Sequence, residues 1–371
     1  MTEQRKPRVA VVFGGRSSEH GVSCVTAGSV LAAIDRDAWD VVPVGITHEG
    51  RWVLAPDEPD KLAVTGSSLP SVPETGAAVV LAGDPTNRDL EVREPGDVPR
   101  TLGQVDVVLP LLHGPYGEDG TIQGLLELAG VPYVGSGVLA SAAGMDKGVM
   151  KALLAAAGLP VGRYVVVPPR RWERSPDAVR AEVEALGFPV FVKPCRAGSS
   201  MGITKVHSAD ELDAAVAEAQ RHDPRVIVEA GVVGREIECG VLEGVDGGEP
   251  EASCVAEIRV GAGHEFYDFE AKYLPDNGTE LDVPADVSDE LSETIRAMAV
   301  QAFEALGCES LARVDFFVLE DGGVMVNEVN TMPGFTPVSM FPLVWAASGL
   351  DYPALVDRLL RTALARPAGL R

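Results

Sequence analysis

A basic residue, two carboxylates and an amide near the C-terminal end of the sequence have types and spacing suited to metal and phosphate chemistry. They are Arg313, Asp315, Glu328 and Asn330. All lie in the run LARVDFFVLEDGGVMVNEVN, in which two apolar, β-branched segments flank a glycine-rich turn, a pattern typical of a β-hairpin. Because side chains alternate between the two faces of a strand, the sequence predicts that all four side chains share one face.

The position of the turn leaves two pairings open. If the two-residue loop is Asp321–Gly322, Asp315 faces Glu328; if it is Gly322–Gly323, Asp315 faces Asn330. Two carboxylates roughly 5 Å apart repel each other. A divalent cation relieves that repulsion, and oxygen ligands that leave room for phosphates favour Mg²⁺. The alternative is a solvated charged face, but a surface hairpin does not need the loop that follows, TMPGFTPVSM, so a site is favoured.

The composition is that of a soluble globular protein. The chain has 371 residues, enough for two or three domains, with 46% hydrophobic and 23% charged residues. Its net charge of −24 argues against nucleic acid and anionic membranes as partners. Five widely spaced cysteines without a CxxC pair, no signal-peptide pattern and no membrane-spanning apolar run predict a cytoplasmic protein.

The order of the expected elements predicts an α/β protein, α+β in parts, with three units. Residues 1–135 alternate strands and helices, which predicts a doubly wound parallel sheet with an insertion of short strands at 51–100. Residues 136–232 form a smaller α+β unit, in which Asp146 is expected to cap a helix. Residues 233–371 form the largest unit, which contains the hairpin.

Two glycine-rich loops follow apolar strands in the first unit and should meet at one crevice, where ligands bind in parallel sheets. GGRSSEH contains Glu19, which could hold an ammonium group; the alternative is a first-turn glutamate favoured by the helix dipole. HGPYGEDG permits close backbone approach to a small ligand, and a capped turn is its alternative. The first loop lacks GxGxxG, so an NAD-dependent oxidoreductase is disfavoured.

Three further segments offer groups that could hold a nucleotide, with plain loops as the alternative for each. KPCRAGSSMG joins two strands and is not a Walker loop, but its backbone N–H groups and Lys193 could bind phosphates. The strand exit VIVEAGVVGRE could pair with an adenine edge, and Glu236 could accept hydrogen bonds from ribose hydroxyls. FYDFEAKY offers Lys272 for a γ-phosphate and Tyr273 as a phenol that handles protons.

Taken together, these segments resemble the D-alanine–D-alanine ligases of the ATP-grasp superfamily. GGRSSEHGVS, HGPYGEDG, GMDK, VKPCRAGSSMGI, EIECGVL, DFEAKY, ARVDFF and NEVNTMPGFTPVSMFP occur in the order found in that family, from residue 14 to residue 342. The resemblance implies an ATP-grasp fold with ATP between the sheets of the central and C-terminal units. It also implies ligation of two D-alanines through an acyl phosphate for peptidoglycan synthesis, two Mg²⁺ or Mn²⁺ ions, and a homodimer.

The resemblance further implies which residues bind and react. The expected ATP ligands are Lys147, Lys193, Ser199, Ser200, Glu229, Ala230, Val232, Glu236, Lys272, Asn327 and Glu328. The expected metal ligands are Asp315, Glu328 and Asn330. The residues expected to bind the two D-alanines are Glu19, His113, Glu118, Arg313, Gly334, Ser339 and Met340. The residues expected to take part in catalysis are Glu19, Ser199, Arg313, Tyr273 and Lys272.

The implied roles are specific for three groups of residues. Glu19 is similar to the residue that holds the ammonium of the first D-alanine. Arg313 and the backbone N–H of Gly334 would hold the oxyanion of the tetrahedral intermediate. Tyr273 and Ser199 would form a hydrogen-bonded relay with Glu19.

Two positions bear on how this sequence compares with the family. Ala197 stands in the lid where many members carry Glu, and Tyr273 is the residue expected of a dipeptide maker, where D-lactate ligases tend to carry Phe or His. The open alternatives are a D-alanine–D-lactate or D-alanine–D-serine ligase, another ATP-grasp carboxylate–amine ligase, and a non-catalytic nucleotide binder. Intact Arg313 and Asp315 argue against the last, because a mere binder could lose them.

Overall fold

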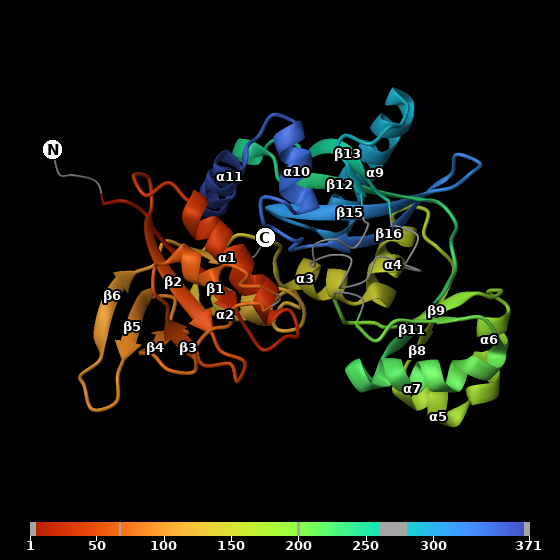
Figure 1. Cartoon of the computed structure of the whole chain (residues 1–371), viewed down its shortest axis with the longest axis horizontal. Coiled ribbons are helices and arrows are strands. Elements are labelled where there is room, and N and C mark those ends of the chain that lie inside the picture. The colour runs from red at the N-terminus through yellow and green to blue at the C-terminus, as the bar shows by residue number, and fades with distance from the viewer. Residues whose placement is uncertain (1–4, 67, 199–200, 260–279, 367–371) are drawn as a thin grey trace.

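The chain folds around three β-sheets, which Figure 1 shows side by side. The computed structural model describes residues 5–366 except 67, 199–200 and 260–279. A seven-stranded sheet comes from the N-terminal part, a four-stranded sheet from the middle and a five-stranded sheet from the C-terminal part. Mixed helices and strands confirm the predicted α/β class.

The N-terminal sheet is parallel only at one side. β1 pairs in parallel with β2 and β7, as predicted, whereas β3 to β6 extend the sheet in antiparallel fashion. The insertion therefore widens this sheet instead of lying apart from it. The helices that follow β1 and β7 are α1 (His20–Ala33) and α2 (Thr121–Ala129). The strands in spatial order are β6 (Arg100–Gln104), β5 (Asp89–Arg93), β4 (Ala78–Leu81), β3 (Trp52–Leu54), β2 (Asp40–Ile46), β1 (Arg8–Gly14) and β7 (Val107–Pro110).

The middle sheet is antiparallel and is covered by helices on one side. Val179 and Val183 of one helix and Val216 of another pack against the buried residues Val190 and Val192 of β9. Helical spacing of these apolar residues explains why both helices lie on the sheet. The strands in spatial order are β10 (Thr204–Val206), β9 (Val190–Pro194), β11 (Val226–Ala230) and β8 (Tyr164–Val167). The helices are α5 (Pro169–Arg174), α6 (Pro176–Glu184) and α7 (Leu212–His222).

The C-terminal sheet carries the predicted hairpin at one edge. Its strands in spatial order are β14 (Glu280–Asp282), β13 (Glu251–Arg259), β12 (Arg235–Leu242), β15 (Leu311–Val318) and β16 (Val324–Asn330). The helices packed with it are α3 (Val138–Met145), α4 (Lys147–Ala156), α9 (Asp289–Leu306) and α10 (Met340–Ala347). Met150 and Leu154 of α4 share a hydrophobic cluster with this sheet, although α4 precedes the middle sheet in the chain. The unit boundary expected at residue 136 stays a prediction.

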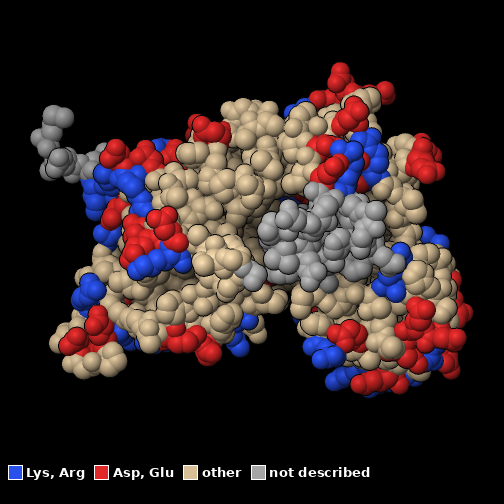
Figure 2. Space-filling model, viewed as in Figure 1, with Lys and Arg blue, Asp and Glu red and all other residues tan. Residues whose placement is uncertain are grey.

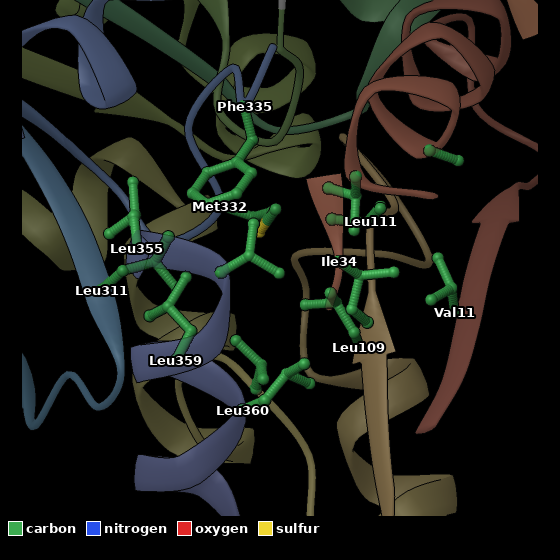
Figure 3. Packing of buried hydrophobic residues seen from close by; sticks show 14 of the residues in the cluster. Val11, Ile34, Leu109, Leu111, Leu311, Met332, Phe335, Leu355, Leu359 and Leu360 are labelled. Carbon is green, nitrogen blue, oxygen red and sulfur yellow. The ribbon is translucent and has the colours of Figure 1, made fainter. Parts of the chain in front are cut away.

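One hydrophobic core joins the N-terminal sheet to the C-terminal end of the chain. It includes α11 (Tyr352–Ala365), whose Leu359 and Leu360 are buried. Figure 3 shows leucines of α11 facing residues from the other side of the cluster. The residues on that side are Val11, Ile34, Leu109 and Leu111. This packing fixes the carboxyl ends of β1 and β7 beside the loop that follows β16.

The surface in Figure 2 mixes charges of both signs, with basic side chains beside acidic ones around the rim of the described face. All five cysteines are free, and four of them are buried. Among the described residues, no helix has the length and apolar character to cross a membrane.

The shared core predicts a stability effect of Leu360→Ala. Leu360 is fully buried at 0% exposure, so its truncation leaves a cavity between the N-terminal and C-terminal parts and should lower the free energy of unfolding by about 2–5 kcal/mol. Urea unfolding followed by circular dichroism measures this loss. The control is Leu128→Ala on α2, where the side chain is 71% exposed and the change should stay within about 0.5 kcal/mol. Equal losses in both variants would contradict the assigned packing.

Candidate active site

A cavity of about 540 Å³ lies between the middle sheet, the C-terminal sheet, and α1 and loops of the N-terminal part. Its walls come from β9 and β11 of the middle sheet, from β12, β15 and β16 of the C-terminal sheet, and from the start of α1. Every expected site residue that the structure describes lines it. They are Glu19, His113, Glu118, Lys147, Lys193, Glu229, Ala230, Val232, Glu236, Arg313, Asp315, Asn327, Glu328, Asn330, Gly334, Ser339 and Met340. Four expected residues lie outside the described part of the chain: Ser199, Ser200, Lys272 and Tyr273.

The hairpin has the first of the two predicted pairings, with Asp315 opposite Glu328 and Arg313 opposite Asn330. The predicted two-residue loop is wrong, because β15 ends at Val318 and β16 begins at Val324. A bulge between Asp315 and the next residue shifts the pairing by one and restores the expected partners. Bulges are common next to active sites, where they re-aim side chains.

Asp315 and Arg313 form the centre of the polar face of the hairpin. Nε of Arg313 donates to Oδ1 of Asp315 at 2.7 Å, and Nη2 donates to Oδ2 at 2.8 Å. Nδ2 of Asn330 also donates to Asp315 Oδ2 at 3.0 Å. Burial alone would lower the pKa of Arg313, but the carboxylates of Asp315 and Glu238 raise it well above its ordinary value. The guanidinium is therefore a fixed positive charge in the cavity.

The hairpin oxygens fit a metal ion that shares its coordination with phosphate. The donors are two carboxylates, Asp315 and Glu328, and the amide of Asn330, all on one face of β15 and β16. In the described ranges, no group of three or more His, Cys, Asp or Glu side chains could hold a metal ion. Mg²⁺ commonly takes one or two carboxylates and fills its other positions with water and phosphate oxygens, so this donor set fits it.

Three lysines converge on the opposite wall. Nζ of Lys193 lies 2.6 Å from Oε2 of Glu229, and Nζ of Lys151 lies 2.9 Å from Oε1 of the same residue. Burial alone would raise the pKa of Glu229, but these two ammonium groups lower it to about 2. Nζ of Lys147 donates to the carbonyl oxygen of Ala197 at 3.0 Å and lies 3.7 Å from Oε2 of Glu328.

Helix α4 aims Lys147 and Lys151 into the cavity. The side chain of Asp146 accepts hydrogen bonds from the backbone N–H groups of Gly148 and Val149, which confirms the predicted cap. Lys151 follows Lys147 by one helical turn, so both side chains lie on the same face. Sequence reasoning missed Lys151, although this i,i+4 spacing was a signal that could have found it.

The end of the cavity nearest the N-terminal sheet is formed by two buried residues, Glu19 and His113, and by the half-buried Glu118. The backbone N–H of Gly114 donates to Oε2 of Glu118 at 2.6 Å, and that of Met332 donates to Oε1 at 3.3 Å. Burial and the neighbouring Glu19 raise the pKa of Glu118 to about 8, so it is mostly protonated at neutral pH. Burial lowers the pKa of His113, whose ring is therefore neutral. Glu118 thus joins the loop after β7 to the loop after β16.

The loop after β16 places the remaining expected residues together. The backbone N–H of Thr336 donates to Oγ of Ser339 at 3.1 Å. A Cβ on Gly334 would lie 3.2 Å from that same hydroxyl, so glycine allows the close approach. Ser339 precedes α10, and Met340 is its first residue.

Other cavity residues were not expected from the sequence, among them Glu238, Val64 and Leu69. Glu238 on β12 lies opposite Asp315, and its Oε2 is 3.0 Å from Nε of Arg313. Alternation from Glu236 along the same strand could have found it. Val64 and Leu69 from the insertion also line the cavity. The segment around them shows no periodicity in the sequence, so nothing there could have indicated this position.

Two protein-family models match the chain. One is described as D-ala D-ala ligase N-terminus and covers residues 8–136; the other is described as D-ala D-ala ligase C-terminus and covers residues 153–361. The chain belongs to the D-alanine–D-alanine ligase family. Its fold is accordingly the predicted ATP-grasp fold.

Individual ligases agree with this assignment along the whole chain. A D-alanine–D-alanine ligase of Kineococcus radiotolerans is 61% identical over 100% of both chains. One of Streptomyces avermitilis is 59% identical over 99% of this chain and 96% of its own length. The solved VanG D-Ala:D-Ser ligase of Enterococcus faecalis is 36% identical, with a TM-score of 0.82 over 97% of this chain and 100% of that chain. The solved D-alanine–D-alanine ligase of Coxiella burnetii is 34% identical, with a TM-score of 0.80 over 97% and 94%.

The raised pKa of Glu118 predicts a pH-dependent effect of Glu118→Gln in this ligase. An unfolded glutamate titrates near pH 4.3, so from there to about 8 the native state holds a proton that the unfolded chain lacks. Wild-type stability should therefore fall with rising pH, by at most about 1.4 kcal/mol per pH unit from this group. The Gln variant cannot titrate, so its stability relative to wild type should rise between pH 5 and pH 8.

Urea unfolding at intervals of pH measures this difference. The matched control is Glu184→Gln on the exposed side of α6, a surface substitution that should change the free energy of unfolding by about 0.5 kcal/mol or less. A pH-independent difference for Glu118→Gln would show that this carboxyl group is not held protonated in the native state.

Proposed function

We propose that this enzyme joins two D-alanine molecules into D-alanyl-D-alanine, converting ATP to ADP and phosphate, for the synthesis of peptidoglycan precursors. One observation carries the proposal: a single cavity is lined by the groups that the reaction needs. They are Arg313 and Asp315 on the hairpin, Lys147 and Lys193, which could bind phosphates, and Glu19. Full-length relatives that carry the name D-alanine–D-alanine ligase support it.

ATP would lie between the middle and C-terminal sheets. Lys147 and Lys193 would bind its phosphates, with Ser199, Ser200 and Lys272 as further expected ligands. Glu229, Ala230, Val232 and Glu236 on one wall, and Asn327 and Glu328 on the other, line the space for the rest of the nucleotide. Lys193 would exchange Glu229 for a phosphate oxygen, and Lys151 would remain to balance the buried Glu229 carboxylate.

Asp315, Glu328 and Asn330 would hold two Mg²⁺ or Mn²⁺ ions, which supply positive charge that neutralises the phosphates. Arg313 and Asn330 donate hydrogen bonds to Asp315, which orient its carboxylate on this face.

The positions of the side chains in the cavity support the following course of the reaction. Glu19 would hold the ammonium of the first D-alanine, beside His113 and Glu118. The carboxylate of that D-alanine would then attack the γ-phosphorus of ATP, and ADP would leave. The amine of the second D-alanine, held through its carboxylate by Ser339 and beside Met340, would attack the acyl phosphate. Arg313 and the backbone N–H of Gly334 would stabilise the oxyanion until phosphate leaves. The relay of Tyr273 and Ser199 with Glu19 stays an expectation.

We further propose that the enzyme works in the cytoplasm as a homodimer. Its ATP requirement supports that compartment, and its free cysteines suit a reducing one. The homodimer is supported by the family resemblance. We expect its partners to be small molecules. The net charge of −24 supports this, because a strongly negative protein is repelled by nucleic acid and by anionic membranes.

A second candidate acceptor is D-serine. It is favoured by the VanG D-Ala:D-Ser ligase, whose structure matches 97% of this chain with a TM-score of 0.82. Phosphate release with ATP and D-alanine alone, against D-alanine with D-serine or D-lactate added, separates these acceptors. We expect turnover with D-alanine alone and little stimulation by the others. Nucleotide binding without any turnover dependent on D-alanine would refute the ligase proposal.

The oxyanion role predicts a kinetic effect of Arg313→Met. Loss of one oxyanion donor should lower kcat on the order of 10² or more, while ADP affinity stays near that of wild type. Phosphate release and calorimetric titration with ADP measure the two quantities. The control is Arg235→Met, which removes an arginine paired with Glu257 outside the cavity and should leave kcat near wild type. An unchanged kcat in Arg313→Met would remove the assigned role.

A further inference from the structure

A third carboxylate extends the acidic face of the hairpin across the sheet. Glu238 on β12 lies directly opposite Asp315 on β15, which lies opposite Glu328 on β16. The three residues therefore form a row across adjacent strands and point to one face. Glu238 is 4% exposed and lines the cavity, yet it is neither an expected metal ligand nor an expected substrate ligand.

Arg313 contacts two of these carboxylates. Its Nε lies 3.0 Å from Oε2 of Glu238 and 2.7 Å from Oδ1 of Asp315. All three side chains are nearly buried, with exposures of 14% for Arg313, 6% for Glu238 and 14% for Asp315. A buried guanidinium needs a paired anion, since an unpaired buried charge is strongly unfavourable.

Asp315 has two partners in the proposed reaction, Arg313 and a metal ion. It pairs with Arg313 through both oxygens, and it is also expected to bind a metal ion. An oxygen that binds the metal gives up part of its interaction with the guanidinium. Arg313 must nevertheless remain in the cavity to act on the oxyanion.

We propose that Glu238 is a positioning residue that keeps the Arg313 guanidinium in place when Asp315 turns its oxygens to the metal ion. The inference rests on the proposed function, because it needs the metal and oxyanion roles of that site. Without Glu238, Arg313 depends more on its ion pair with Asp315, so the guanidinium competes more strongly with the metal. In this proposal Glu238 acts through Arg313. The alternative explanation is that the negative charge of Glu238 attracts the metal ion directly, independently of Arg313.

A double-mutant cycle on metal binding separates these two modes of action. The probe is Mn²⁺ in the presence of ADP, with free Mn²⁺ measured by electron paramagnetic resonance, for wild type, Glu238→Gln, Arg313→Met and the double variant. We expect Glu238→Gln to weaken Mn²⁺ binding about tenfold when Arg313 is present, and about threefold or less when it is added to the Arg313→Met variant. It should also lower kcat while leaving KM for ATP close to wild type.

The control variant is Glu257→Gln. Glu257 lies on the neighbouring strand β13 and pairs with Arg235 at 2.7 Å, outside the cavity lining. The Glu257→Gln substitution removes one negative charge from the same sheet, as Glu238→Gln does, and should leave Mn²⁺ affinity unchanged. Circular dichroism verifies that each variant is folded. Should Glu238→Gln not fold, Glu238→Asp takes its place in the cycle, because the shorter side chain breaks the contact but keeps the charge.

If Glu238→Gln weakened Mn²⁺ binding by an equal or larger factor in the Arg313→Met variant than in wild type, the proposal would be overturned. Glu238 would then act on the metal ion through its charge alone. Wild-type affinity in Glu238→Gln would overturn it as well, as would absence of Mn²⁺ binding to the wild-type protein. The proposed function is tested separately by phosphate release that depends on D-alanine. A wild-type protein that binds Mn²⁺ and ADP but shows no such release would refute the ligase reaction and leave the binding cycle interpretable.

Discussion

Compensation of buried negative charge is the constraint on which this cavity depends. Glu238, Asp315 and Glu328 stand in a row on one sheet face, and an unpaired carboxylate in such a place would be costly. Arg313 lies between the first two, and Lys147 approaches the third. These basic groups, which balance the carboxylates, are the same groups to which the proposed reaction assigns phosphate and oxyanion binding. In the proposed reaction, binding would exchange partners among charges that line one cavity.

The opposite wall follows the same principle with the ratio reversed, because one carboxylate there is balanced by two cations. Glu229 is a single buried carboxylate held between the ammonium groups of Lys193 and Lys151. In the proposed reaction, Lys193 would turn to a phosphate while Lys151 keeps the carboxylate paired. A site with one lysine alone would leave Glu229 unbalanced whenever nucleotide was bound. Lys151 also donates to the carbonyl oxygen of Asn327 at 3.2 Å, so it joins both walls of the cavity.

The hydrophobic core between the N-terminal sheet and α11 decides where the substrate end of the cavity lies. It sets Glu19 and Glu118 against the loop after β16, and Glu118 bonds to backbone N–H groups on both sides of that junction. Close approach is needed here: a Cβ on Gly114 would lie 2.6 Å from Oε2 of Glu19. Packing far from the chemistry therefore controls the distance between groups that must act on one small substrate.

Local pattern in the sequence determined much of this protein. Period-two alternation put Arg313, Asp315, Glu328 and Asn330 on one face, Asp146 marked the start of α4, and motif order indicated the family. These features depend on neighbours in the chain, and the residues themselves carry the signal. The length of the hairpin loop was mispredicted because the bulge that restores the register has no sequence signature of its own.

Only the tertiary structure decided which distant groups meet. Lys151 pairs with Glu229, Glu238 pairs with Arg313, and Val64 and Leu69 of the insertion reach the cavity wall. Each of these contacts joins different segments of the chain, and its distance is set by how sheets and helices pack. The residue spacing within one segment does not predict such a distance. The hydrophobic effect that packs the elements is not directional, so the pattern of one element does not specify which residues of another it will contact.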